Sequence, residues 1–438
     1  MKRWIVVLLV VLAVVVLVSP GIIGHLAERN LEQNLVWATS ESSGIEIQTE
    51  RFERGWFTSE GRHRVLLDAA AFREAAISYR QSSGNDELPS LLIDTRLDHG
   101  LVPVGDAGSL APGLANMLST FQIDPGNGEL VELPGSLRSK VGLSGSSDSR
   151  FLLEKGRYES GEGRVEWNGA DITLQTDWSD GTLIIDGRVE PIHIGSADET
   201  LDIGALTVMA NQIRGGYGFN EGTASLEIES IVVESPGNTV TVGATAFSAG
   251  ADIADSRLSF ESTISVEEFV IPAMGEMSFV MDMALNRLDA ASMQVIVQAF
   301  REAQESADPE QAVAGVLPKI QDDVQQLLTA GAEIRLDQLD ISLPQGKLTT
   351  NLRIDIPEGD AGANFSWAGV LLAMTATADL RLPTALFDLV LTMNPQANAL
   401  IAIGILQRDG DDYVMQAEYA QGLLNVNGAP MPVPMPGM

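Results

Sequence analysis

Four segments in the middle of the chain repeat one hydrophobic pattern, apolar-x-apolar-x-x-apolar-x-apolar. They cover residues 201–208, 226–233, 264–271 and 334–341. Successive side chains of a β-strand point to opposite faces of its sheet, so each half of the pattern predicts a half-strand with one apolar face. In a regular strand, the extra residue between the halves would place the apolar side chains of the second half on the opposite face of the sheet. A strand that keeps one face buried across this step needs a β-bulge, which bends and twists the sheet.

Alternating segments of the same kind continue along most of the chain after residue 44. Gly, Ser, Asn and Asp-Gly turns separate them at a spacing of about 8–12 residues, which is typical of an extended antiparallel sheet. The four repeated segments would give this sheet a curved form with an apolar concave face. Two interpretations of that face stay open. It is core covered by helices of the same chain, or it is a groove that holds an acyl chain or another apolar ligand.

Four stretches show helical spacing instead of alternation. Residues 289–306 and 310–330 predict a helical hairpin between the third and fourth repeated segments. The strongly apolar stretch 383–406 predicts a helix that is broken at Asn394-Pro395, and residues 109–121 predict a short helix. The expected fold class is therefore α+β, with extended curved antiparallel β-sheets, helices packed on one face and one N-terminal transmembrane helix.

The start of the chain carries a membrane signal. Lys2 and Arg3 precede a nearly uninterrupted apolar run over residues 4–23. About twenty helical residues span the hydrocarbon layer of a bilayer, and the basic end stays in the cytoplasm by the positive-inside rule. We expect an uncleaved anchor with an exported body; a cleaved signal peptide is the alternative, although Pro20 would lie beside one cleavage position. The residues that represent the anchor are Trp4, Leu8, Leu12, Val16 and Ile23.

These signals divide the chain into four parts. Residues 1–24 are the N-terminal transmembrane anchor and residues 25–43 a juxtamembrane helix. Residues 44–197 form a β-rich N-terminal part of the exported body. Residues 198–438 form an α+β C-terminal part that contains the helical hairpin at about 289–330.

Composition excludes several classes of function. The formal net charge is −33, from 27 Lys and Arg against 60 Asp and Glu, and no basic cluster interrupts the acidic surface. Nucleic-acid binding needs a basic patch, so it is not expected. The chain has no Cys and four scattered His, which excludes disulfides, thiol nucleophiles and cysteine zinc sites, and no metal site is expected. No nucleophile, phosphate-binding or dinucleotide motif is complete, so we expect no cofactor and no enzymatic activity.

Four short motifs follow one another along the exported part. They are Arg-Gly-Trp-Phe-Thr-Ser at 54–59, Asp-His-Gly-Leu-Val-Pro at 98–103, Gly-Leu-Ser-Gly-Ser-Ser at 142–147 and Tyr-Ala-Gln-Gly-Leu-Leu-Asn-Val-Asn-Gly at 419–428. With the N-terminal anchor, their order and spacing resemble the YdgA-like proteins, bacterial envelope proteins of unknown function, over nearly the full length. The motif positions are Arg54, Gly55, Trp56, Phe57, Asp98, His99, Gly100, Ser144, Gly145, Tyr419, Gly422, Asn427 and Gly428.

The resemblance implies a single-pass protein of the bacterial inner membrane with a cytoplasmic N-terminus and a periplasmic body. It brings no assigned activity and hence no catalytic residues. The matching positions are mostly Gly and turn residues, which indicates turns that specify the fold rather than chemistry. We expect a non-enzymatic envelope scaffold or interaction protein. A binder or carrier of a lipid or other apolar molecule in a sheet groove is the alternative, and an unrecognised envelope enzyme is the second alternative. A homo-oligomer or an envelope protein partner is compatible with each.

The first motif has two structural interpretations. Trp56 and Phe57 can straddle a strand, with one ring in the core and Gly55 allowing a bulge. They can instead lie among lipid headgroups, because they follow the anchor by only about thirty residues. We expect the first arrangement.

Overall fold

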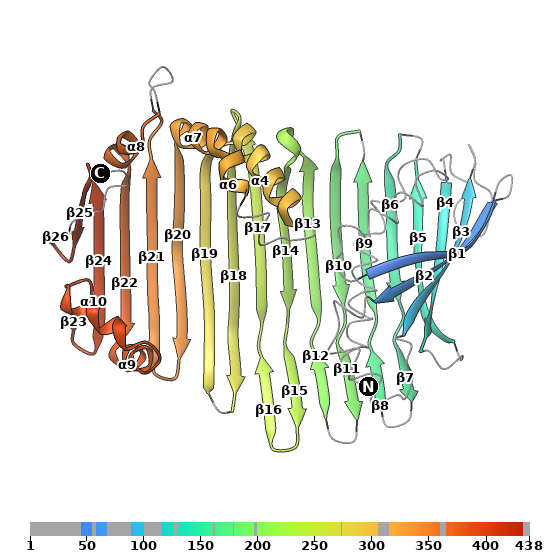
Figure 1. Cartoon of the computed structure of the whole chain (residues 1–438). Helices are drawn as coiled ribbons and strands as arrows, with labels where there is room; N and C mark the ends of the chain where they lie inside the picture. Colours follow the sequence, from blue (N-terminus) through green and yellow to red (C-terminus); the bar gives the residue numbers. More distant parts are fainter. Residues whose placement is uncertain are drawn as a thin grey trace. The chain divides into compact units, whose positions relative to one another are not determined.

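The computed structural model describes residues 45–54, 58–67, 89–99, 115–125, 130–142, 144–160, 163–177, 179–196, 199–272, 274–304, 315–359 and 365–431. Figure 1 shows its elements along the chain. The described residues form two compact units. The first ends at Ile213 and also contains Leu226–Thr239, and the second consists of Arg214–Ser225 and the chain from Val240 onwards. Both units are mostly β and are built from antiparallel strand pairs.

Short and medium strands make up the first half of the chain. They are β1 (Ile45–Arg54), β2 (Thr58–Leu67), β3 (Ser90–His99), β4 (Ala115–Asp124), β5 (Val131–Val141), β6 (Ser147–Leu153), β7 (Gly156–Ser160), β8 (Gly163–Trp167), β9 (Ala170–Asp177), β10 (Thr182–Val189), β11 (Ile192–Ser196), β12 (Thr200–Ile203), β13 (Leu206–Arg214), β14 (Asn220–Ile228) and β15 (Ile231–Ser235).

The second half combines longer strands with helices. Its strands are β16 (Asn238–Val242), β17 (Thr245–Ala254), β18 (Arg257–Ile271), β19 (Gly275–Asp289), β20 (Ala332–Leu343), β21 (Gly346–Ile356), β22 (Thr375–Pro383), β23 (Gln407–Asp409), β24 (Asp412–Ala420), β25 (Leu423–Val426) and β26 (Ala429–Met431). Its helices are α4 (Ala290–Gln304), α6 (Val316–Lys319), α7 (Gln321–Ala330), α8 (Trp367–Ala373), α9 (Thr384–Met393) and α10 (Ala399–Ala402), with 3₁₀ turns η2 (Gly216–Gly218) and η3 (Pro395–Asn398).

Breaks divide the long strands of the first unit into halves. The halves on one side pair as β6–β9–β10–β13, and those on the other side as β7–β8–β11–β12–β15. Backbone hydrogen bonds join neighbouring breaks. The Glu190 amide donates to the Gly169 carbonyl at 2.9 Å, and the Glu229 amide donates to the Ala205 carbonyl at 2.9 Å. The polar backbone of the breaks is therefore paired rather than left open.

An irregular step is present in all four repeated segments, as a β-bulge in two of them and as a full strand break in the other two. The first two segments are interrupted at Gly204-Ala205 and Glu229-Ser230, where β12 passes into β13 and β14 into β15. In the third, the pairing of β18 with β19 shifts between Val266 and Phe269. In the fourth, the pairing of β20 with β21 shifts between Leu336 and Leu339. The predicted bulge is therefore confirmed in the third and fourth segments, whereas the first and second segments are broken into two strands each.

The predicted helices of the second unit are also confirmed within the described residues. The hairpin appears as α4 followed by α6 and α7, and α4 packs against α7. The apolar stretch 383–406 becomes α9, η3 and α10. It is interrupted at the expected place, where the Asn394 side chain accepts a hydrogen bond from the Gln396 amide at 3.2 Å and Pro395 begins the 3₁₀ turn. Helix α8 was not expected from the sequence.

The short helix expected at residues 109–121 was wrong for its described part. Residues 115–124 are strand β4, which pairs with β3 and β5. Leu, Ala and Met favour a helix locally, but burial follows a period of two: Ala115, Met117 and Phe121 are each buried. Pairing on both sides gives these residues more buried surface than an isolated helix turn, so tertiary context overrides local propensity.

The core of the first unit lies along these strands. Phe121 and Phe151 meet edge to face with ring centroids 5.6 Å apart. Trp167 belongs to the same buried cluster and donates from its indole nitrogen to the Glu154 carbonyl at 2.8 Å. Its ring occupies the space that a Cβ of Gly156 would need, so a side chain at position 156 would displace the indole.

Helices cover the sheet of the second unit at the two ends of its strands (Figure 1). Residues of α4 and α7 pack with Leu258, Leu288 and Ala332 at one end. At the other end, Leu386 and Phe387 of α9 pack with a second set of strand residues. Those strand residues are Leu343, Leu348, Leu380, Leu382, Tyr413 and Met415.

The predicted membrane anchor and juxtamembrane helix, residues 1–43, lie outside the described residues, as do Gly55, Trp56 and Phe57. Among the helices that the structure describes, none combines the length and apolarity needed to cross a bilayer.

The two faces of α9 give a direct test of the second unit's core. Phe387 is 1% exposed, whereas Met393 on the same helix is 82% exposed. Phe387→Ala should lower the free energy of unfolding by about 3–5 kcal/mol, because it removes the ring and leaves a cavity. Met393→Ala should change it by less than about 0.5 kcal/mol. Chemical denaturation of both variants measures the difference, and equal effects would contradict the packing of α9.

His63 on β2 makes the first unit sensitive to mild acid. It is buried, its Nδ1 shares a hydrogen bond with the Thr49 hydroxyl at 3.1 Å, and its Nε2 has no partner. Burial lowers the pKa of His63 below its usual 6.5, and the more weakly acting Asp94 carboxylate opposes this. The unfolded chain therefore binds a proton at a higher pH than the folded chain.

Stability should consequently fall as the pH drops below about 6.5 towards the lower pKa of the folded state. His63→Gln keeps a polar group near Thr49 but does not titrate. Denaturation series between about pH 7 and pH 5 should show a smaller loss of stability in this variant than in the parent. Identical slopes in the two proteins would show that burial of His63 does not control this pH response.

Candidate functional site

The candidate site is an apolar surface on the sheet of the second unit, between its two helical covers. Strand register places its side chains on one face, because directly paired residues of neighbouring strands share a face. Met281 on β19 is paired with Ile264 on β18 and with Leu339 on β20. One row away, Leu336 is paired with Met283 and Leu352. We call this surface the open band, consisting of Ile264, Met281, Met283, Leu336, Leu339 and Leu352.

The bulge in β20 makes the open band continuous. Leu336 and Leu339 are three positions apart, so in a regular strand they would point to opposite faces. Asp337 and Gln338 together oppose the single residue Asn351 of β21, and the extra residue returns Leu339 to the face of Leu336. The chemistry of this surface therefore depends on the repeat recognised in the sequence.

Among the residues that the structure describes, neither helical cover packs its buried cluster against the open band. Its six residues belong neither to the cluster under α4 and α7 nor to the cluster under α9, and each keeps an intermediate exposure. Phe247 on β17, which is paired with Ile264, extends the surface and is 40% exposed. The two ends of the apolar face are core that is covered by helices. The middle of this face is the open band, which is partly exposed.

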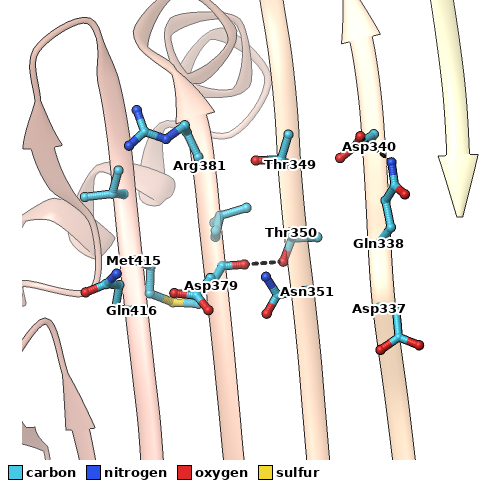
Figure 2. A pocket seen from close by; sticks show the side chains of 12 residues that line it. Asp337, Gln338, Asp340, Thr349, Thr350, Asn351, Asp379, Arg381, Met415 and Gln416 are labelled. Carbon is cyan, nitrogen blue, oxygen red and sulfur yellow. Dashed lines mark hydrogen bonds between the residues drawn. The ribbon is translucent and has the colours of Figure 1, made fainter. Parts of the chain in front are cut away.

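The opposite face of the same strands is polar. Asp340 accepts from Lys347 at 2.8 Å, and Glu333 forms an ion pair with Arg353. The hydrogen bond from Lys347, and to a smaller extent that from Gln338, lowers the pKa of the Asp340 carboxyl. A hollow of about 260 Å³ lies here. Figure 2 shows the mostly polar side chains of β20, β21, β22 and β24 that line it. The Thr350 hydroxyl donates to the Asp379 backbone carbonyl at 2.8 Å and so joins β21 to β22.

A wider hollow of about 710 Å³ lies along the strand breaks of the first unit. His193 on β11 contacts Asp202 on β12, with 2.5 Å between Nδ1 and the carboxylate, and is paired with Glu166 on β8. Arg164 donates to Glu166 and lowers the pKa of its carboxyl. The sequence analysis did not identify this contact. Only the register of the β11–β12 hairpin brings His193 and Asp202 together.

The contact between His193 and Asp202 is exposed to solvent. The side chains of His193 and Asp202 are 38% and 51% exposed. Exposed pairs of this kind contribute little to stability, since water screens them. In the described part of the chain, no group of three or more His, Asp or Glu is arranged to hold a metal ion.

The fourth sequence motif holds two helices on the sheet. The Tyr419 hydroxyl donates to the Leu371 carbonyl of α8 at 2.8 Å. The Asn427 amide donates to the Gly404 and Ile405 carbonyls, both at 3.0 Å, directly after α10, and its carbonyl oxygen accepts from the Gln416 amide at 2.8 Å. Tyr419 thus joins strand β24 to α8, and Asn427 joins the turn after β25 to the segment that follows α10.

Two turns in this motif require left-handed backbone. Gln421 and Gly422 have φ of 52° and 78° between β24 and β25, and Asn427 and Gly428 have φ of 52° and 79° between β25 and β26. Two-residue hairpin turns with both φ values positive match the right-handed twist of the flanking strands and favour Asn-Gly. These motif residues determine turn geometry.

The other motif positions that the structure describes are also structural. Asp98 on β3 is buried, and its carboxylate accepts from the Thr58 hydroxyl at 3.1 Å. Ser144 and Gly145 lie in the turn before β6, and Gly145 has φ of 87°. Arg54 and His99 end strands β1 and β3, and their side chains lie outside the described set, together with Gly100. The structure does not bring these motif positions together into one site.

Comparison with known proteins gives a family and one distant relative. The family model for DUF945, a bacterial protein of unknown function, matches residues 1–434. Protein YdgA of Escherichia coli K12 is 22% identical over 256 residues, which are 52% of this chain and 49% of YdgA. The chain therefore matches about half the length of this curated relative. No solved structure matches the chain.

The side-chain hydrogen bonds of Asn427 can be tested without changing the conformation of its turn. Asn427→Gly keeps a backbone of φ 52° accessible but removes the hydrogen bonds to Gly404, Ile405 and Gln416, and should destabilise the second unit by about 1–3 kcal/mol. Asn427→Asp keeps the acceptor for Gln416 but places a carboxylate against two carbonyls, so it should destabilise at least as much. Denaturation curves of Asn427→Asp that match the parent would show that the hydrogen bonds of the Asn427 side chain do not stabilise the second unit.

Proposed function

Because this chain belongs to the DUF945 family of bacterial proteins of unknown function and is distantly related to YdgA of Escherichia coli, we propose its role from its structure. It is an envelope protein that acts by binding, and it holds an apolar chain of a lipid on the open band. The observation that supports this most directly is the uncovered apolar surface between the two helical covers of the second unit.

The shape and composition of the surface fit a flexible apolar chain. From β17 to β21 the surface crosses five strands, a span of about 19 Å at about 4.8 Å per strand. Met281 and Met283 lie at its centre, and methionine side chains adapt to ligands of irregular shape. The open band itself has no charged member, whereas the opposite face of the same strands has ion pairs. A chain bound here would bury apolar surface on both sides of the contact.

The sequence supports a location in the bacterial envelope. The apolar run over residues 4–23 after Lys2 and Arg3 is suited to an inner-membrane anchor with a periplasmic body. The absence of Cys fits an exported chain, and the charge of −33 fits a soluble body that avoids nucleic acid. In this proposal the chain is not an enzyme, because the contact of His193 with Asp202 in the hollow of the first unit is exposed to solvent.

A scaffold that binds another envelope protein is the second candidate. The observation that favours it is a patch beside α8, where Trp367, Leu372 and Leu423 are 50%, 54% and 64% exposed. Trp is the residue most enriched at energetically dominant positions of protein interfaces. The patch belongs to other residues than the open band, so the two candidates can be tested separately.

Photo-crosslinking in cells distinguishes the candidates in the full chain. Leu339→p-benzoylphenylalanine places a photoreactive group on the open band, and Thr377→p-benzoylphenylalanine places it on the opposite face, where the side chain is exposed. We expect lipid adducts at position 339, detected by mass spectrometry of the purified chain, at about tenfold or more over position 377.

Two results would contradict the proposal. Equal lipid labelling at positions 339 and 377 would mean that the contact is not specific to the apolar face. Protein adducts at 339 in place of lipid adducts would make the scaffold the better candidate.

A further variant, Leu339→Glu combined with a photoreactive group at Met281, should lose lipid labelling by about tenfold, since a carboxylate cannot enter an apolar contact without losing its hydration.

A further inference from the structure

A second apolar surface lies at one end of the strands of the second unit and involves other residues than the open band. Helix α9 places Leu386 and Phe387 in the core and leaves Leu389, Val390 and Met393 exposed towards its C-terminal end. Figure 1 shows α9 and α10 together at this end. We call the surface the aliphatic rim: Met274, Leu389, Val390, Met393, Leu400 and Ile403.

The turn that contains Met274 adjoins this end. A Cβ at Gly275, which follows Met274, would lie 2.6 Å from the ring of Pro344 in the β20–β21 turn. A Cβ at Gly346 would lie 2.6 Å from the ring of Pro383, the residue before α9. The turns and the helix are therefore in contact at the same end of the strands.

The exposure of the rim is too large for incidental surface residues. Met393 is 82% exposed, Ile403 56% and Met274 55%. The remaining members, Leu389, Val390 and Leu400, are 48%, 41% and 36% exposed. Exposed apolar side chains that gather at one end of a body indicate a contact with another protein or with a membrane.

Charge favours the membrane. Residues 384–406 contain a single charged side chain, Asp388, in a chain whose net charge is −33. An acidic body is repelled by anionic headgroups, and this repulsion is weakest where charges are missing. Residues 384–406 therefore add little electrostatic repulsion to an approach to a bilayer, and the neighbouring Asp409 and Asp412 are paired with Arg381.

The side-chain types point the same way. Every member of the rim is aliphatic or Met, and residues 384–406 contain no Trp, Tyr or Arg, the residues that dominate the binding energy of protein interfaces. Backbone carbonyls at the ends of α9 and α10 also have hydrogen-bond donors, as an apolar environment requires. The last carbonyls after α10, those of Gly404 and Ile405, accept from Asn427, and the Asn394 amide after α9 donates to the Val390 carbonyl at 2.7 Å.

From these observations we infer that the aliphatic rim is a membrane-docking site, which inserts into the boundary between the headgroups and acyl chains of a phospholipid bilayer. The inference does not depend on the open band. Both proposals involve lipid. The open band is proposed to bind the apolar chain of a single lipid, whereas the aliphatic rim is proposed to contact the surface of a bilayer.

The absence of Cys in the chain allows a direct test. Single variants Met393→Cys and Ile403→Cys carry a spin label, and the full chain is reconstituted with vesicles of phosphatidylcholine and phosphatidylglycerol. Power-saturation spectroscopy then compares the accessibility of each label to oxygen, which enriches in the bilayer, and to an aqueous nickel reagent. Leu372→Cys beside α8 is the matched control, because it is apolar, 54% exposed and outside the rim.

We expect the labels at 393 and 403 to lie about 5–10 Å below the headgroup level. The label at 372 should stay accessible to the aqueous reagent. Labels at 393 and 403 that remain as water-accessible as the label at 372 would overturn the inference. Labels that are shielded from both reagents and show dipolar broadening would overturn it as well, since they would indicate contact with a second copy of the chain.

A substitution gives an independent check. Met393→Glu adds a charge at a position that is 82% exposed, so it should not affect folding, and near-ultraviolet circular dichroism verifies this. In a Val390→Glu, Met393→Glu double variant, the label at Ile403→Cys should regain access to the nickel reagent by at least about fivefold. Unchanged access in a folded double variant would refute docking through the rim. Lipid labelling at position 339 reports the open band separately, so failure of one proposal does not imply failure of the other.

Discussion

The structure depends on one constraint: each long strand must keep its apolar side chains on one face across an irregular step. A strand without the step would do so by simple alternation, but it would be straighter and less twisted. Here Leu336 and Leu339 share a face because β20 has one residue more than β21 between them. The same arrangement occurs between Val266 and Phe269 in β18, and as a full break between Ile203 and Leu206. Removing one residue at any of these steps would exchange the apolar and polar faces of half a strand.

This constraint gives the sheet of the second unit two chemically different faces. On the polar face, neighbouring strands are joined by ion pairs such as Arg353 with Glu333 and Lys347 with Asp340. The basic side chains of these pairs are exposed to water, which screens the pairs and limits what they add to stability, while the partner Glu333 is buried. The free energy of folding therefore comes mainly from the apolar face, where α4, α7 and α9 cover its ends. The uncovered middle contributes less to the core and remains available for contacts with other molecules.

The sequence predicted the parts of this architecture that depend on local pattern. The repeat located the bulges, the periodicity of 289–330 located α4 and α7, and Asn394-Pro395 located the break after α9. It did not predict β4, because the Leu, Ala and Met residues of 109–121 suit a helix as well as a strand that is paired on both sides. It could not pair His193 with Asp202, since hairpin register is needed, nor could it determine how far the helices extend over the sheet.

The same reasoning explains why recognisable motifs and the candidate site do not coincide. Asn427 and Gly428 need particular backbone conformations, and Tyr419 and Asn427 need particular hydrogen-bond partners, so few other residues can replace them. The open band needs only apolar side chains of suitable size, and Ile, Leu and Met exchange there at small cost. Motifs in such a chain therefore identify turns, and side chains whose hydrogen bonds hold α8 and the segment after α10 in place. The surface proposed to bind is visible only as a periodicity, and strand register is needed to place its residues on one face.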